Sequence, residues 1–140
     1  MLSVTVICVG NLKEAYLRDA VKEYEKRLAA YCRFKTLELK DGTPILPHLP
    51  ERAYRVALCV EGKQLSSEEL ADKLNDVSAT HGEICIVIGS SFGLDDSVKN
   101  AGDMRLSVSK LTFPHQLMRV ILLEAIYRGF NILKGTHYHK

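Results

Sequence analysis

The chain has 140 residues, of which 46% are hydrophobic and 26% charged, which is the ordinary composition of one soluble globular domain. No apolar run approaches the roughly 20 residues that span a bilayer, and the first residues lack the basic segment of a signal peptide, so we expect a cytoplasmic protein. The net charge is +2, but residues 99–140 hold seven Lys and Arg against two acids, which is typical either of a face that meets phosphates or of a solvated surface.

The first third of the chain predicts two strands with a helix between them. Leu2–Val9 is a β-branched, mostly apolar run that ends at Gly10, as a buried strand does. Lys13–Tyr31 carries apolar residues at helical spacing, which indicates an amphipathic helix with one face on a sheet. Phe34–Leu39 alternates apolar and polar residues, as a half-exposed strand does. Asp41–Ala53 holds three prolines, so we expect an extended or polyproline II connector rather than a regular helix.

The middle of the chain predicts a second strand–helix–strand unit. Arg55–Val60 is an apolar strand that should stop at Glu61 and Gly62. Ser66 and Glu69 form the S-x-x-E pattern of a capping box, so a helix should begin there and end before Gly82. Glu83–Ile88 is the most strongly β-prone run in the chain.

The last third should begin with a loop and end with a long helix. Gly89–Gly93 follows the strand as a glycine-containing loop, and a short helix should start near Asp95. Arg105–Ser109 is a final short strand. Pro114 is suited to the first turn of the last helix, with Thr112 or Phe113 near its cap.

Strands that alternate with helices predict one α/β domain over residues 1–140, with a mainly parallel sheet flanked by helices. Ligands of such domains gather at the carboxyl ends of the strands, and Gly10, Gly62 and Gly89 stand at three of the predicted ends. The four cysteines are widely spaced and form no C-x-x-C pair, so we expect buried reduced thiols and neither disulfides nor a metal site. They are Cys8, Cys32, Cys59 and Cys85.

Two segments could carry chemistry. The loop Gly89–Gly93 offers close backbone approach, but its spacing matches neither a dinucleotide fingerprint nor a P-loop, and a tight turn without a ligand explains it equally well. The junction Ser107–Arg119 brings hydroxyl, ammonium, imidazole, amide and guanidinium groups together between a strand and a helix. Its centre, Ser109–Arg119, is the predicted site. His115 could accept a proton there, although a structural role is common for such a histidine.

The last helix and the tail suggest partners. The helix is apolar over more than one face, which indicates a central position or a subunit interface, and we favour a homodimer. The tail ends in Tyr138, His139 and Lys140. Chain ends are often disordered, but these side chains could also stack on and grip a nucleotide.

Several motifs resemble those of one enzyme family. They are V-G-N-L-K-E-A-Y (9–16), V-E-G-K-Q-L-S-S-E-E-L-A (60–71), I-V-I-G-S-S-F-G-L (86–94), L-S-V-S-K-L-T-F-P-H-Q-L-M-R-V (106–120) and Y-H-K (138–140). Together they resemble the YbeA-like (RlmH) family of SPOUT-class methyltransferases, which methylates N3 of a pseudouridine in large-subunit (23S) ribosomal RNA with S-adenosylmethionine. The stretch T-F-P-H-Q-L-M-R is highly specific, whereas the glycine loop alone is weak.

The resemblance implies a homodimer with a deep trefoil knot in about residues 84–140, and an RNA site that the partner subunit completes. It also implies a cofactor site built by eight residues: Leu58, Gly89, Val108, Ser109, Lys110, Leu111, Thr112 and Phe113. From residue chemistry we predict that four further residues orient or deprotonate the base, with the tail supplied by the other subunit: His115, Arg119, Tyr138 and His139. The ribosomal RNA partner would be met within the ribosome, and neither a metal nor a membrane is implied.

Two departures from the family pattern bear on these expectations. Ser90 stands where the family usually has a second glycine, which is tolerable only if that position needs no positive φ and no very close ligand. Asp41–Ala53 replaces a longer charged segment, which puts RNA contacts from that region in question. Two alternatives stay open: a non-enzymatic RNA- or ribosome-binding protein of the same fold, and an α/β protein that binds another nucleotide at Gly89–Gly93.

Overall fold

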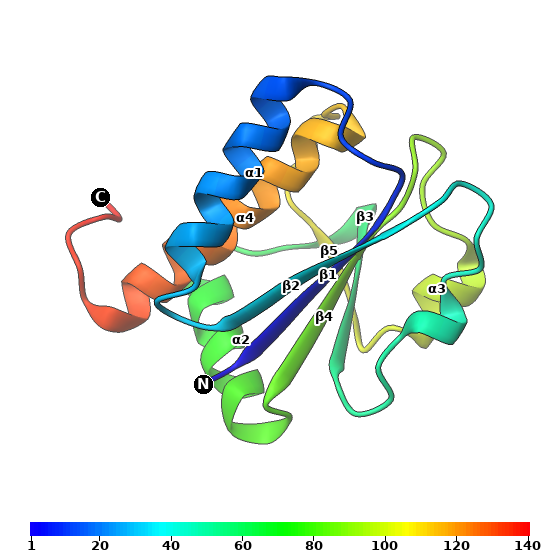
Figure 1. Cartoon of the computed structure of the whole chain (residues 1–140). Helices are drawn as coiled ribbons and strands as arrows, with labels where there is room; N and C mark the ends of the chain where they lie inside the picture. The colour runs from blue at the N-terminus through cyan, green and yellow to red at the C-terminus, as the bar shows by residue number, and fades with distance from the viewer.

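The computed structural model describes residues 1–140 and shows a five-stranded, fully parallel sheet with helices on both faces (Figure 1). The strand order is β2-β1-β4-β3-β5. The strands are β1 (Ser3–Val9), β2 (Arg33–Leu39), β3 (Tyr54–Gln64), β4 (Glu83–Ile88) and β5 (Met104–Ser107). The helices are α1 (Ala15–Leu28), α2 (Ser67–Thr80), α3 (Asp96–Ala101) and α4 (His115–Lys134), with a short 3-10 helix η1 (Leu46–His48). The predicted α/β class and parallel sheet are confirmed.

The two faces of the sheet carry cores of different size. In β1, Val4 and Val6 face a large core that α1, α2 and α4 cover, while Ile7 faces a smaller core under α3 and η1. All three side chains are buried, and full burial of such a side chain contributes about 1.5–3 kcal/mol. Burial on both faces explains why the central strands are mostly apolar in the sequence.

The cysteines follow the prediction for small buried hydrophobes. Cys8, Cys32 and Cys85 are buried and Cys59 is half-buried, and none forms a disulfide. Burial raises the pKa of the Cys8 thiol to about 11 and that of Cys85 to about 12, so both stay protonated and unreactive at neutral pH.

Strand β3 is longer than its sequence suggested. It was expected to stop at Glu61 and Gly62, but it continues to Gln64 with a register shift against β5 between Leu58 and Lys63. The prediction was wrong because Glu61 and Gly62 were taken as turn residues that end the strand. In the structure they lie within β3, in the stretch where its register against β5 shifts. Gly62 is required there, since a Cβ at this position would lie 2.6 Å from the backbone carbon of Leu106.

The proline-rich connector is not wholly extended. Leu46–His48 forms a 3-10 turn with Pro47 near its start, where the missing N–H of proline costs nothing. Leu49 and Ala53 are buried against the smaller core, so the connector covers part of the sheet. Of the two expectations for this connector, the absence of an α-helix is confirmed, whereas a wholly extended conformation is not.

Helix α4, which borders the site, begins later in the chain than the sequence predicted. Helix α4 begins at His115, one residue after the predicted start, because Pro114 is extended (ψ 137°) and serves as N-cap, its carbonyl accepting from the Met118 N–H. None of the helices has the length and apolar character that crossing a membrane requires.

Helix α2 has the predicted capping box. The Glu69 N–H donates to Ser66 Oγ at 3.0 Å, and the Ser66 N–H donates to Glu69 Oε1 at 2.8 Å. We expect Ser66→Ala to lower the free energy of unfolding by about 1 kcal/mol, because one N-terminal N–H of the helix loses its partner. Urea unfolding monitored by circular dichroism measures this. Ser78→Ala, at an exposed position of the same helix, is the control and should change stability by less than about 0.5 kcal/mol.

Candidate cofactor site

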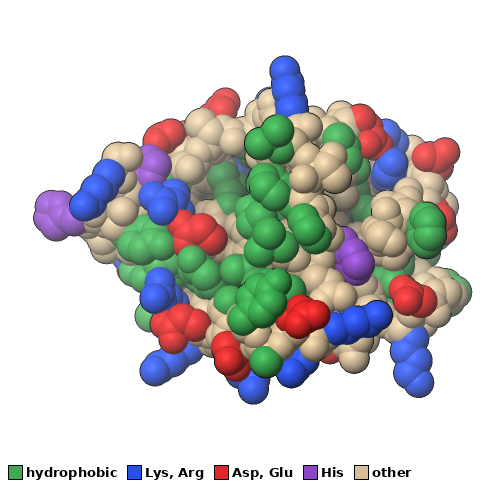
Figure 2. Space-filling view, turned by 90° about the horizontal axis from the view of Figure 1, so that it is seen from above, with side chains coloured by type: hydrophobic (Ala, Val, Ile, Leu, Met, Phe, Trp, Pro, Cys, Tyr) green, Lys and Arg blue, Asp and Glu red, His purple; other side chains and the backbone are tan.

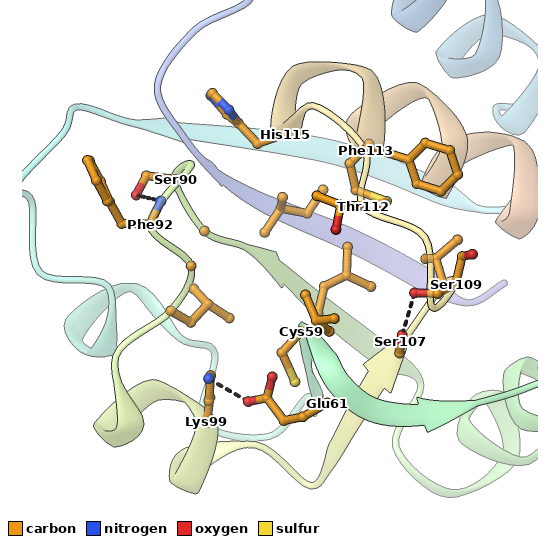
Figure 3. Close-up of a pocket in the computed structure, with 18 of the residues that line it drawn as sticks. Cys59, Glu61, Ser90, Phe92, Lys99, Ser107, Ser109, Thr112, Phe113 and His115 are labelled. Atoms are coloured by element: carbon orange, nitrogen blue, oxygen red, sulfur yellow. Dashed lines mark hydrogen bonds and ion pairs between the residues drawn. The ribbon is translucent and has the colours of Figure 1, made fainter.

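A cavity of ≈ 350 Å³ opens at the carboxyl ends of β3, β4 and β5 (Figure 3). This volume lies within the range of small-molecule sites. Three segments form its walls: residues 58–61 of β3, the loop 88–94 after β4, and the segment 107–113 between β5 and α4. Its position is the one where parallel α/β sheets bind ligands, and its mostly apolar lining with a few polar groups is typical of such sites.

The glycine loop after β4 is a tight turn whose shape requires both glycines. A Cβ on Gly89 would lie 2.5 Å from the carbonyl oxygen of Gly93, and Gly93 itself has φ +84°. The Gly93 N–H donates to the Ser90 carbonyl at 2.9 Å, which closes the turn. Ser90 does not have a positive φ, and its Oγ accepts from the Phe92 N–H at 3.2 Å. The backbone therefore accommodates the serine that departs from the family pattern.

The segment after β5 is held by its own hydroxyl groups. Ser107 Oγ donates to the Ser109 carbonyl at 3.0 Å, and Ser109 Oγ accepts from the Leu111 N–H at 3.0 Å (Figure 3 shows the first bond). The segment thus keeps a fixed curve beside the cavity without regular secondary structure. Seven of the eight predicted cofactor residues line the cavity: Leu58, Gly89, Val108, Ser109, Leu111, Thr112 and Phe113. Lys110 does not line it and is exposed.

The structure adds an ion pair that sequence reasoning missed. Lys99 of α3 and Glu61 of β3 both line the cavity, and Lys99 Nζ donates to Glu61 Oε1 (Figure 3). The hydrogen bond from Lys99 lowers the pKa of the Glu61 carboxyl, and the same bond raises the pKa of Lys99. Beside them, burial raises the pKa of the half-buried Cys59 thiol. Nothing in the sequence signalled this pair, because its members are 38 positions apart and Glu61 looked like a strand terminator.

Of the four residues predicted to act on the base, only His115 lines the cavity. Arg119, one turn further along α4, is buried, and its Nη1 donates to Glu38 Oε2 of β2 at 2.7 Å. The Arg119 side chain is 8% exposed and that of Glu38 is 43% exposed. The ion pair therefore joins a buried residue of α4 to an exposed residue of β2. Within one protomer, Arg119 therefore lies outside the cofactor cavity.

Tyr138 and His139 lie beside the middle of α4, away from the cavity. Tyr138 Oη donates to Glu124 Oε2 at 2.7 Å, and the Arg128 guanidinium sits 4.8 Å from the centre of the Tyr138 ring. Burial would raise the pKa of the Glu124 carboxyl, but hydrogen bonds from Tyr138, Tyr24 and Arg128 hold it below its usual value. The tail thus packs against α4 of its own chain.

His139 completes this arrangement. Its Nδ1 lies 3.2 Å from Arg128 Nη1, and its Nε2 lies 2.6 Å from Glu68 Oε1. Because a guanidinium can only donate, Nδ1 must accept, and Nε2 then carries the proton that it donates to Glu68.

The structure contains no group of three or more His, Cys, Asp and Glu side chains that could hold a metal ion.

The cavity and its glycine loop define an α/β domain with a cavity of small-molecule size at the carboxyl edge of its sheet. Residues 2–139 match the family described as predicted SPOUT methyltransferase. The chain is 46% identical to a ribosomal RNA large subunit methyltransferase H of Bifidobacterium adolescentis, over 160 aligned positions that cover 99% of this chain and 100% of the relative. It is 45% identical to the protein of the same name from Clostridium novyi, over 159 positions with the same coverage. The chain therefore belongs to the SPOUT methyltransferase family, and it is a methyltransferase.

Solved structures agree on the fold. A probable methylase family protein from Haemophilus influenzae superposes with a TM-score of 0.63 at 10% identity, over 98% of this chain and 70% of the other. A probable methyltransferase from Bordetella pertussis gives the same TM-score and identity, over 91% and 95%. The family assignment decides against the alternative of a non-enzymatic RNA- or ribosome-binding protein.

Proposed function

We propose that this enzyme transfers a methyl group from S-adenosylmethionine to N3 of a pseudouridine in the 23S RNA of the large ribosomal subunit. Its relatives over the full chain are named ribosomal RNA large subunit methyltransferases. The observation that carries the proposal is the position of His115, which lines the cofactor cavity at the start of α4, where an acceptor would enter. A ribosomal substrate also implies that the enzyme works in the cytoplasm.

The residues of the cavity fit the proposed cofactor. Apolar side chains such as Leu58 and Ile88 can receive the adenine ring, and Gly89 lets the ligand approach the backbone. Val108 through Phe113, with Lys110 contributing its backbone, would surround the adenosyl group. The Glu61 carboxylate and Lys99 ammonium carry both charges that the amino-acid end of the cofactor needs as partners.

The reaction places modest demands on the side chains. When bound, S-adenosylmethionine supplies a methyl group on a positively charged sulfur, which departs as a neutral thioether. The chain must hold the acceptor at reacting distance, exclude water and receive the proton from N3. His115 can accept that proton on a ring nitrogen, because no hydrogen bond within the chain engages its imidazole. Arg119 and the tail lie outside the cavity of their own chain, and they are proposed to orient the base and to favour its anion at the cavity of a partner subunit.

The proposal includes a homodimer. Leu117, Val120 and Ile121 of α4 remain half-exposed, and hydrophobic side chains form a band across the face that α1 and α4 share (Figure 2). Such a band is typical of a subunit interface. Tyr138 and His139 lie apart from their own cavity, so they could take part in the reaction only at the cavity of the partner. The family relationship further supports one domain with a trefoil knot in about residues 84–140.

Labelled methyl transfer tests the proposed function. Wild-type protein and labelled S-adenosylmethionine are incubated with assembled ribosomes, with isolated large subunits or with naked 23S RNA. We expect label in 23S RNA at one pseudouridine, which nuclease digestion and mass spectrometry identify as the N3-methyl product. Cofactor binding without label in any of the three substrates would mean that the substrate is not ribosomal RNA.

Replacement of His115 tests the proposed base. We expect His115→Ala to lower kcat for ribosomes at least about tenfold, because general base catalysis typically contributes that much or more. The dissociation constant of S-adenosylmethionine, measured by calorimetry, should change by less than about threefold, since the side chain stands at the edge of the cavity. A variant with wild-type kcat and unchanged affinity for ribosomes would remove His115 from the catalytic residues.

A further inference from the structure

A second hollow lies directly beside the cofactor cavity. It has a volume of ≈ 470 Å³ and shares three residues with that cavity: Ser90, Phe92 and His115. Its other walls come from the segment after β1, the turn after β2 and the start of α4. We call it the polar hollow, because only two of its eleven lining residues are hydrophobic. Any ligand in the polar hollow would therefore meet the cofactor cavity at His115.

The walls of the polar hollow are held in place by hydrogen bonds. The Gly10 N–H donates to the Leu39 carbonyl at 2.7 Å, which ties the end of β1 to the end of β2. The Lys13 N–H donates to Gln116 Oε1 at 3.0 Å, which ties the same segment to α4. This second bond fixes the orientation of the Gln116 amide: its oxygen faces Lys13, so its NH₂ group is free to donate to a ligand.

The free groups of the polar hollow match the edge of a pyrimidine base. The Asn11 side chain is exposed and makes no hydrogen bond within the chain, so its amide can donate. A uracil-type base has a carbonyl on each side of N3, and two amide donors suit that pattern. Phe92 is 98% exposed at the tip of the glycine loop, where a ring exposed so fully offers a face on which a base can stack.

The directions of the two rings agree with this arrangement. Figure 3 shows the side chains of Phe92 and His115 at the end of the cofactor cavity that lies away from Ser107 and Ser109. A base between the ring of Phe92 and the start of α4 would present its N3 edge toward His115. Enzymes that modify a base draw it out of its stack into such a pocket.

We propose that the polar hollow is the acceptor site: it receives the flipped uracil-type base, stacked on Phe92, with the Asn11 and Gln116 amides donating to the two carbonyls that flank N3. This inference rests on the proposed function and specifies where its substrate binds. It gives the segment after β1 and the turn Asp41–Gly42 a role in substrate binding, although neither contributes to the cofactor cavity.

Replacement of Asn11 tests the acceptor site, because Asn11 lines the polar hollow and not the cofactor cavity. We expect Asn11→Ala to lower kcat/KM for ribosomes about tenfold, as loss of one hydrogen bond to a buried base does, while the calorimetric Kd of S-adenosylmethionine stays within about twofold of wild type. The matched control is Asn75→Ala, at an exposed position of α2 outside both cavities, which should leave both quantities unchanged.

The outcomes separate this inference from the proposed function. If wild-type protein methylates ribosomes and Asn11→Ala behaves like Asn75→Ala in both measurements, the base binds elsewhere and the acceptor site is wrong. If Asn11→Ala weakens cofactor binding as much as it lowers kcat/KM, the polar hollow belongs to the cofactor site, and the inference is equally wrong. If wild-type protein fails to methylate ribosomal RNA, the proposed function itself fails.

Discussion

Gly89→Ala is expected to weaken binding of S-adenosylmethionine roughly 100-fold, which corresponds to about 2.7 kcal/mol. The new Cβ would lie 2.5 Å from the Gly93 oxygen, 2.6 Å from the Gly93 carbonyl carbon and 3.0 Å from Leu94 Cδ2. The first two are backbone atoms, so the turn must open rather than a side chain rotate away. Because the turn forms one wall of the cavity, its displacement changes the surface that the cofactor contacts.

Calorimetry with S-adenosylmethionine measures the affinity, and thermal unfolding without ligand measures the separate cost of overpacking, about 1–3 kcal/mol. Gly102→Ala is the matched control. Gly102 has no positive φ, and its nearest neighbours to a new Cβ stand at 3.4 Å, which is close to ordinary contact. That variant should bind the cofactor as the wild type does. A Gly89→Ala protein that is folded and binds the cofactor normally would show that the cofactor does not contact the glycine loop.

The sequence predicted the sheet well because burial leaves a direct mark on composition. Leu2–Val9 and Glu83–Ile88 pass through the interior, where both faces favour apolar residues, so each is mostly apolar in the sequence. The boundaries were less predictable, because they depend on contacts between distant segments. Strand β3 continues past Gly62, where the backbone of β5 packs closely against the glycine, and no local pattern contains this long-range contact.

The residues of the candidate site also fall into two groups, those that local motifs predicted and those that only long-range contacts reveal. The family motifs named the residues of 108–113, and the structure brings most of them to one cavity. The pairs Glu61–Lys99 and Arg119–Glu38 join residues from different strands and helices, so only the fold could reveal them. Arg119 shows the limit most clearly. Its type and position in the sequence suggested chemistry, and the structure shows it paired with the Glu38 carboxylate outside the cofactor cavity, a contact that no local pattern contains.

The position of the tail leads to the second large effect. Tyr138 contacts Glu124, which lies about 13 Å further along α4 than His115 at the helical rise per residue. Neither Tyr138 nor His139 lines the cofactor cavity of its own chain. In the proposed homodimer, these side chains would act on the base in the partner's cavity. We expect removal of residues 138–140 to lower kcat for ribosomes roughly 100-fold, because a base-orienting group is lost from every site.

Mixed dimers distinguish this arrangement from a purely structural tail. One subunit carries Gly89→Ala with an intact tail, and the other lacks residues 138–140 but has an intact cavity. At a concentration of S-adenosylmethionine near the wild-type Kd, each parent dimer should keep only about a few per cent of wild-type activity. A mixed dimer contains one site with an intact cavity and the intact tail of its partner. Random exchange makes half of the dimers mixed, so about a quarter of wild-type activity should return in a two-fold symmetric assembly. If activity stays at the sum of the two parents, the tail serves its own subunit, because only a tail donated across the interface can restore a site that neither parent has.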